Sequence, residues 1–336
     1  MRVETDYAAM RLPHLLIASA ALIGCAACSS ADDDGGFLVA APTSTPTAEI
    51  PVATATATVA PAPTTEATPT PVETPAQAPS LQVNTTWIAP GSVVEVTIND
   101  ANAAGTATLL ERDFRLSAVN GHTWGLVGVG PDAALGGANL HVELESGLLF
   151  DQYVEVIDAG YPIDYITLTE TSSGLLTPDN AAYERERVAE ARAHFEPEAY
   201  WEGSFIYPLH TYITAEYGDA RSYNGGPVSS WHRGVDFGAP EGYPIRAANS
   251  GVVVLAEELP LSGNCVFIHH GFGIFSQYSH QSRLLVVEGQ RVEKGDIIGE
   301  VGATGIVTGA HLHWSMYVGD VAVNPHQWTW QTMRLP

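Results

Sequence analysis

The fold is decided by three short stretches near the C-terminus, WHRGVDF (231–237), QYSH (277–280) and GAHLHW (309–314). The first stretch places His232 and Asp236 four positions apart, and the last places His311 and His313 two positions apart. On a β-strand, side chains at even spacings leave the same face, so we expect each pair to point at one spot. Two histidines and a carboxylate, with a position left open for water, are an established zinc site in hydrolases.

In this order, the three stretches resemble peptidase family M23, the lysostaphin-like zinc endopeptidases of cell walls, whose pattern is H-x-x-x-D followed by H-x-H. The resemblance covers residues 207–328 and also includes GVDFGAPEGYPIRAANSGVVV (234–254), GNCVFIHHGFGIFSQYSH (263–280) and VEGQRVEKGDIIGEVGATGIVTGAHLHW (287–314). It implies a mainly β fold, in which an antiparallel β-sheet carries the metallopeptidase site.

The resemblance also implies a role for each residue of the pattern. His232, Asp236 and His313 would bind Zn²⁺, and the fourth position would hold water. His280 and His311 would be catalytic, one as general base and the other orienting the water or stabilising the charged intermediate. An imidazole with a pKa of about 6.5 suits proton transfer at neutral pH. The sequence leaves open which histidine takes which role.

Other candidate residues carry weaker signals. Tyr223 lies nine positions before His232 in ARSYNGG, and related enzymes place a tyrosine upstream of the first ligand, where its hydroxyl would donate to the developing oxyanion. Arg221 is interpreted as a surface residue, with pairing to a substrate carboxylate as the alternative. The histidines without a place in the family pattern are expected to be structural or to lie at the rim of the site: His269, His270 and His326.

The chain is strongly acidic, with 14 Lys and Arg residues against 38 Asp and Glu residues and a formal net charge of −24. It offers no basic surface for a phosphate backbone, so we expect no nucleic-acid partner. Two of the three cysteines lie in an apolar N-terminal stretch, and only Cys265 belongs to a region expected to fold. We therefore expect no disulfide within a domain and interpret Cys265 as an inert core thiol.

The N-terminus reads as an export signal followed by a tether. Two arginines precede an apolar run at residues 12–27, which is too short for a transmembrane helix. LIGC (22–25) resembles a bacterial lipobox, so residues 1–25 are interpreted as a lipoprotein signal with Cys25 as the acylated residue. Cys28 is the alternative attachment site, and an ordinary cleaved signal is the alternative to lipidation. The Thr-, Pro- and Ala-rich residues 26–79 cannot bury a core and are expected to be a disordered spacer.

A β module is expected at residues 80–160. Apolar and polar residues alternate in SVVEVTI (92–98), TATLLE (106–111), TWGLVGV (123–129), ANLHVELE (138–145) and DQYVEVI (151–157). Strands at this spacing, separated by turn residues, are typical of an Ig-like β-sandwich. Residues 161–200 are expected to connect the module to a peptidase domain at 201–336, through a helix at 178–196 with Thr177 or Asp179 as its N-cap.

The sequence therefore predicts an exported, lipid-anchored zinc endopeptidase of the cell envelope, which cleaves peptides of bacterial peptidoglycan. Some members of the resembling family lack site residues and activate amidases instead, so a non-catalytic wall-binding protein or amidase activator is the alternative. All five positions of the pattern are filled here, which favours the enzyme. The bond cleaved, any protein regulator and the role of the β module are left open.

Overall fold

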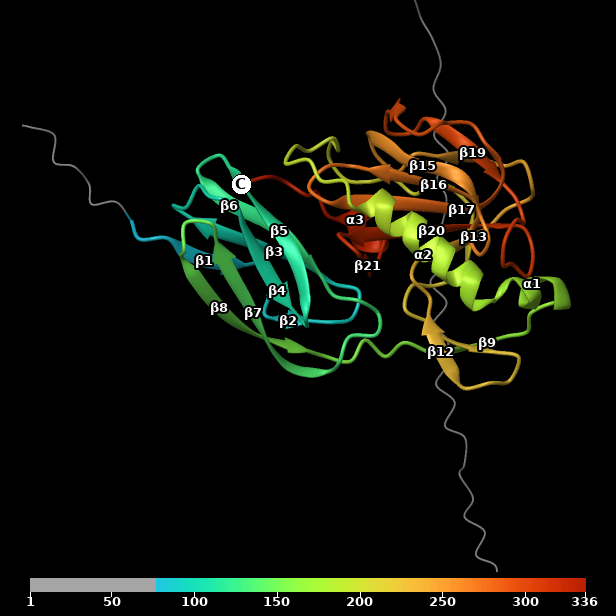
Figure 1. Ribbon diagram of the computed structural model, residues 1–336, viewed down its shortest axis with the longest axis horizontal. Helices are drawn as coiled ribbons and strands as arrows, with labels where there is room; N and C mark the ends of the chain where they lie inside the picture. The colour runs from blue at the N-terminus through green and yellow to red at the C-terminus, as the bar shows by residue number, and fades with distance from the viewer. Residues whose placement is uncertain (1–76) are drawn as a thin grey trace, which may run out of the picture. The chain divides into compact units, whose positions relative to one another are not determined.

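The computed structural model describes residues 77–336 (Figure 1). The predicted lipid-attachment residues Cys25 and Cys28, the signal segment and almost all of the tether lie outside the described residues. Among residues 77–336, none of the helices combines the length and the apolar character needed to cross a bilayer.

A β module forms the N-terminal part of the described chain (Figure 1). Its strands are β1 Ser80–Val83, β2 Trp87–Ile88, β3 Val93–Asn99, β4 Gly105–Leu109, β5 Arg112–Val119, β6 His122–Gly128, β7 Gly136–Leu144 and β8 Leu149–Val156. They follow the order β1-β3-β6-β5-β4-β7-β8-β2 and pair in antiparallel fashion, except that β2 runs parallel to β8. Alternation sets the core, because Val94, Val96 and Ile98 of β3 are fully buried while Glu95 and Thr97 between them are partly exposed.

Strand β5 links β4 to β6, because it pairs with a different strand at each of its ends. Its first residues, 112–116, pair with β4, and its last, 117–119, pair with β6. The five strands predicted from alternation correspond to β3, β4, β6, β7 and β8, whereas β1, β2 and β5 were not predicted. β5 begins with Arg112 and Asp113, so its apolar alternation starts only at Phe114. The Ig-like assignment of the module stays a prediction.

A connecting segment follows, with β9 Ile163–Ile166, α1 Glu170–Leu175 and α2 Pro178–Arg192. The Thr177 side chain accepts a hydrogen bond of 3.2 Å from the Asn180 N–H, and Pro178 occupies the first helical position, so α2 begins where its cap predicts. The helix ends at Arg192, earlier than the predicted residue 196. Pro197 disfavours helical backbone at the residue before it, and α2 ends ahead of that position.

The C-terminal part is built on an antiparallel sheet, as predicted. Its strands are β10 Tyr212–Ala215, β13 Val235–Gly238, β14 Pro244–Arg246, β15 Gly251–Leu259, β16 Gly263–His269, β17 Ile274–Leu284, β18 Arg291–Val292, β19 Ile297–Val301, β20 His311–Val318 and β21 Val321–Val323. The main path is β10-β13-β20-β17-β16-β15-β18. A smaller sheet, in the order β12-β11-β9, joins β11 Ala220–Tyr223 and β12 Val228–Trp231 to the connecting segment, and α3 His326–Trp330 closes the chain.

Strand β20 separates the core from the site. Leu312 and Trp314 are fully buried, whereas His311 and His313 alternate with them and are partly exposed on the other face. Directly across from His313 lie Asp236 on β13 and Ser279 on β17. The register of three neighbouring strands therefore brings the second and third sequence motifs next to the first.

Candidate metal centre and catalytic site

Three side chains bring one potential ligand atom each to a single point. Asp236 Oδ1 lies 2.7 Å from His313 Nδ1 and 3.0 Å from His232 Nε2, and the two ring nitrogens are 3.0 Å apart. Asp236 lies on β13 and His313 on β20, and all three side chains are largely buried. These residues form the one group of metal-ligand type found in the described part of the chain.

His232 reaches this point by a route that the sequence did not predict. We expected His232 and Asp236 to share a strand face, but β12 ends at Trp231 and β13 begins at Val235, so His232 lies in the connection between them. The connection runs close to β20, where a Cβ on Gly234 would lie 2.4 Å from the Trp314 carbonyl oxygen. Backbone bonds then fix His232, because its N–H donates to Asp219 O at 2.8 Å and its C=O accepts from Gly218 N at 2.8 Å.

Each histidine of the group has its second nitrogen bound by the protein. His232 Nδ1 lies 2.5 Å from Glu216 O, and since a carbonyl only accepts, Nδ1 carries the proton and Nε2 is free to bind a metal. In His313 the roles of the two nitrogens are exchanged: Nε2 lies 2.8 Å from the Ser315 hydroxyl, and Nδ1 faces Asp236. Such outer hydrogen bonds are how proteins orient histidine ligands.

Asp236 divides its two oxygens between partners. Oδ1 faces the two ring nitrogens, and Oδ2 lies 3.2 Å from Arg221 Nη2. Burial by itself would raise the pKa of this carboxyl, but the neighbouring His232 and His313 hold the pKa well below its usual range. Asp236 is therefore an anion in a mostly buried position, which a bound cation would neutralise.

The three donor atoms fit a metal ion. Zinc binds His nitrogen and carboxylate oxygen at about 2.0–2.2 Å in tetrahedral geometry, which separates neighbouring ligand atoms by about 3.3 Å. The observed separations of 2.7–3.0 Å need only a small expansion to reach that spacing. We conclude that the three side chains are close enough together to hold a divalent metal.

His280 and His311 lie beside this group, and their catalytic roles stay a prediction. Their ring centroids are 4.9 Å apart, and the His280 ring is 6.1 Å from that of His313. His311 Nε2 lies 3.9 Å from Asp236 Oδ1. Both rings donate Nδ1–H to a backbone carbonyl at 2.9 Å, His280 to Thr304 and His311 to Gly309, so each keeps Nε2 free. Burial, reinforced by the neighbouring His311 and His313, lowers the pKa of His280 to about 3.

A β-bulge aims His280 at the site. Between β16 and β17, Asn264 pairs with Gln281 and Val266 with Tyr278, so Ser279 and His280 together oppose Cys265 alone. His280 has a φ of +65°, a left-handed conformation that is unusual for a residue with a side chain. A bulge breaks the strict alternation of faces and redirects a side chain. With regular alternation, the His280 side chain would lie on the opposite face of the sheet from His313, because Ser279 is the residue paired with His313. The bulge places His280 on the same face as His311 and His313.

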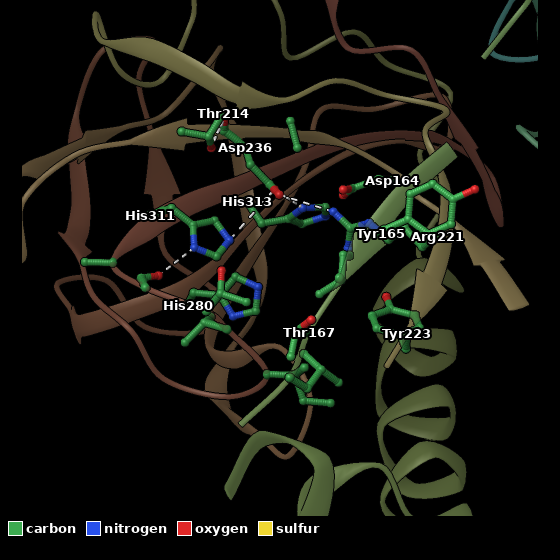
Figure 2. A pocket seen from close by; sticks show the side chains of 18 residues that line it. Asp164, Tyr165, Thr167, Thr214, Arg221, Tyr223, Asp236, His280, His311 and His313 are labelled. Atoms are coloured by element: carbon green, nitrogen blue, oxygen red, sulfur yellow. Dashed lines mark hydrogen bonds and ion pairs between the residues drawn. The ribbon is translucent and has the colours of Figure 1, made fainter. Parts of the chain in front are cut away.

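One trough, with a volume of about 460 Å³, is lined by Asp236, His280, His311 and His313. Figure 2 shows Asp236, His280, His311 and His313 on one side of it, and Arg221 and Tyr223 on the other. The lining comes from β9 and the chain after it (164–168), β10, β11, β13, the bulge of β17 and the loop 306–310 that leads into β20. The predicted Tyr223 thus shares the trough with the histidines.

Two features of the trough were not predicted. Arg221 is not the surface residue that we expected, since only 20% of its side chain is exposed and it pairs with Asp236. β9 was expected to be part of an undefined connection, yet Asp164 and Tyr165 line the trough. Its four residues, IDYI, pair in parallel with β11, more than fifty positions later, so no local pattern marks them.

The remaining histidines of residues 77–336, and Cys265, lie outside the trough lining. His270 is buried between Ser250 O and Ser276 Oγ, both at 2.8 Å, and burial lowers its pKa to about 3. His326 bonds the Glu216 carboxylate at 2.7 Å, so it braces the residue whose carbonyl holds His232. Burial raises the pKa of Cys265 to about 12, in keeping with an inert core thiol.

Comparison with known proteins identifies the domain that carries this site. The sequence profile of peptidase family M23 matches residues 230–325. The peptidoglycan DD-endopeptidase ShyC of Vibrio cholerae is 43% identical over 105 residues, which are 31% of this chain and 23% of the relative. The DD-carboxypeptidase/endopeptidase Mpg of Neisseria meningitidis is 38% identical over 127 residues, 37% of this chain and 28% of the relative. An uncharacterized metalloprotease of Buchnera aphidicola is 36% identical over 97 residues, 29% of this chain and 26% of the relative.

The match spans about a quarter of the length of these relatives. A longer stretch is similar in fold to a crystal structure assigned to peptidase M23 from Pseudomonas aeruginosa, with a TM-score of 0.55 and 24% identity over 72% of this chain and 94% of that one. At this identity the likeness establishes the fold. Residues 230–325, which match the profile of peptidase family M23, contain the metal-ligand group and both further histidines.

Proposed function

We propose that this protein is a zinc-dependent endopeptidase that hydrolyses peptide bonds of bacterial peptidoglycan, in the cross-bridge or in the stem peptide. The observation that carries the proposal is the convergence of three buried ligand-type atoms at a trough that also presents two histidines with free Nε2 atoms. Relatives named as peptidoglycan DD-endopeptidases support the substrate class.

His232, Asp236 and His313 would hold the zinc ion, through Nε2, Oδ1 and Nδ1 respectively. The chemistry that zinc supplies when bound is polarisation of a carbonyl and a lowered pKa of water. The protein contributes the fixed positions: Glu216 O and Ser315 Oγ orient the two rings, and Arg221 occupies the second oxygen of Asp236.

The catalytic histidines are suited to moving a proton at Nε2. Nδ1–H of His280 and of His311 is engaged by a backbone carbonyl, so the lone pair of each ring lies on Nε2. One of them would accept the proton of the attacking water, and the proton would then pass to the leaving amine nitrogen. The other would orient the water or stabilise the charged intermediate. Tyr223 would donate its hydroxyl hydrogen to the developing oxyanion.

The decisive experiment is digestion of purified muropeptides by the full chain. We expect new amino termini, and we expect a chelator to abolish them and added zinc to restore them. His280→Ala and His311→Ala should each keep zinc but lose turnover by about 100-fold or more, as loss of a general acid-base catalyst does. Zinc loss in His311→Ala would instead make His311 a ligand. Muropeptide binding without any new amino termini would favour the non-catalytic wall-binding protein or amidase activator.

We further infer that the protein is exported and anchored to a membrane by lipid on Cys25, where it faces the cell wall. The lipobox-like LIGC (22–25) supports the anchor, and the Thr- and Pro-rich residues 26–79 would be the spacer. An extended Pro-rich chain gains about 3.1 Å per residue, so such a spacer would span on the order of 100 Å. Action in the cell envelope agrees with relatives that are named for peptidoglycan.

A further inference from the structure

Strand β9 has one side that no other strand covers. It is the edge of the sheet β12-β11-β9 and pairs in parallel with β11, with Ile163 opposite Ala220 and Ile166 opposite Tyr223. The N–H of Ala220 donates to Pro162 O, and the N–H of Asn224 donates to Ile166 O, both at 2.8 Å. In a parallel pair, alternate residues of a strand direct their main-chain groups to the neighbour. Positions 162, 164 and 166 therefore face β11, and Ile163 and Tyr165 face away from it.

The main-chain groups that face away are open. Across residues 77–336, the structure gives the N–H and C=O of Ile163 and Tyr165 no hydrogen-bond partner. Tyr165 as a whole residue is also 74% exposed. Uncovered strand edges readily pair with another extended chain, and proteins usually keep them short for that reason. β9 is four residues long, which fits a docking edge that admits one short segment.

This edge borders the catalytic trough. Residues 164–168 line the trough together with Asp236, His280 and His311. In Figure 2, Thr167 lies between His280 and Tyr223, and Tyr165 lies next to Arg221. The facing wall, residues 306–310, is a loop without strand pairing, and Ser172 Oγ of α1 donates to Val307 O at 3.1 Å between the two walls. The trough thus has one wall that can form a β-ladder, next to the ligand group.

We propose that β9 binds the peptide part of the substrate by strand addition, which rests on the proposed peptidase function. An extended segment of peptide would accept from the N–H of Tyr165 and donate to the C=O of Ile163 and Tyr165. Main-chain pairing of this kind replaces the water that a peptide loses on entering the trough, and it fixes the chain direction relative to the metal group. The substrate class is accordingly a peptide that can extend over several residues beside the bond that is cleaved.

The proposal can be tested by removing one N–H. Tyr165→Pro deletes the open donor but breaks no bond to β11, and proline is tolerated at the open side of an edge strand. Tyr165→Ala is the matched control, since it removes the same ring and keeps the N–H. With a purified cross-linked muropeptide dimer as substrate, we expect the KM of Tyr165→Pro to exceed that of Tyr165→Ala by about tenfold, or about 1.4 kcal/mol, with kcat within about twofold. Equal KM values for the two variants would overturn the proposal.

A second measurement covers the case in which the proline variant unfolds. In the full-length His280→Ala protein, hydrogen exchange of single amides is followed with and without the muropeptide dimer. We expect the Tyr165 amide to become protected at least about tenfold, whereas the Asp164 amide, which already faces β11, changes little. An unprotected Tyr165 amide in the bound protein would rule strand addition out. If the wild-type chain cleaves no muropeptide, the proposed function itself fails. That outcome can be told apart from a failure of the KM test or of the hydrogen-exchange test, which concern strand addition alone.

Discussion

At the scale of single residues, Asp236 determines how the metal group is assembled. Its Oδ1 faces both ring nitrogens while its Oδ2 is held by Arg221, so the carboxylate has one orientation. The family pattern marks His232, Asp236 and His313 as candidate ligands, and the structure brings their side chains together. Arg221 could not be predicted in the same way, since its contact depends on how β11 lies against β13 and no spacing records that.

Replacing Asp236 by Ala should abolish metal binding. We expect a loss in zinc affinity greater than about 100-fold, more than removal of an outer partner of a ligand causes. The measurement is zinc content after dialysis against a weak chelator, followed by competition with a chelating dye. His210→Ala is the control, because His210 is exposed and does not line the trough. Full zinc occupancy in Asp236→Ala would refute the ligand assignment.

Arg221→Gln should weaken zinc binding by about tenfold and keep the fold, because the second oxygen of Asp236 would lose its charged partner. The zinc affinity of Arg221→Lys should lie between that of the wild type and that of Arg221→Gln, since lysine supplies charge without the planar fork of a guanidinium. The same dye competition measures both. Arg246→Gln serves as the control, because Arg246 bonds the Gly295 carbonyl instead. An Arg221→Gln protein with unchanged zinc affinity would show that Arg221 does not support Asp236.

At the scale of elements, α2 supports the site from outside the family domain. Glu184 on α2 accepts from Leu261 N at 2.7 Å, Ser262 N at 3.1 Å and Ser262 Oγ at 2.6 Å, in the turn between β15 and β16. The carbonyl of Ser262 accepts from His280 N at 2.8 Å. The helix therefore fixes the turn, and the turn fixes the bulge that aims His280.

Glu184→Gln should lower the free energy of unfolding by about 2 kcal/mol, because hydrogen bonds to a charged group are replaced by weaker ones. Chemical denaturation measures this change. Turnover should fall in the same variant while zinc content stays full, since the variant disturbs His280 and leaves the ligands alone. Glu186→Gln on the exposed side of the same helix should change neither quantity. A stable Glu184→Gln protein with normal turnover would contradict the linkage.

The sequence predicted elements unevenly, and the reasons are physical. Strands such as β3 and β7 alternate apolar and polar residues, and α2 begins at a Thr-Pro cap, so local patterns marked them. β9 is too short to show a period, and its partner lies far along the chain. The bulge at His280 arises from a mismatch between two strands, which neither strand reveals by itself.

At the scale of the whole molecule, the β module and the C-terminal part share specific contacts. Gln327 of α3 donates to Gly91 O at 2.9 Å and accepts from Val93 N at 3.1 Å. Trp124 of β6 meets Phe272 edge-on, with ring centroids 5.2 Å apart. Sequence alone predicted two folded regions, but it could not predict these contacts, because each involves residues that look like ordinary core or surface positions.

Labelling cells with radioactive palmitate should mark the wild-type protein, because an acylated cysteine is the physical basis of the proposed anchor. Cys25→Ala should lose the label and be released from membranes, whereas Cys28→Ala should keep it. Cell fractionation followed by detection of the label provides the measurement. Label that survives in Cys25→Ala and disappears in Cys28→Ala would move the attachment site to Cys28.

The contribution of β9 to the trough affects how the protein could be divided into fragments. A fragment cut at residue 201, the domain boundary expected from the sequence, would lack the strand that pairs with β11, which carries Arg221, and the helix that carries Glu184. Such a fragment would keep the proposed metal ligands and still be a poor substitute for the intact protein. A cut shortly after β8, near residue 159, would retain both supports and should give a far more active piece.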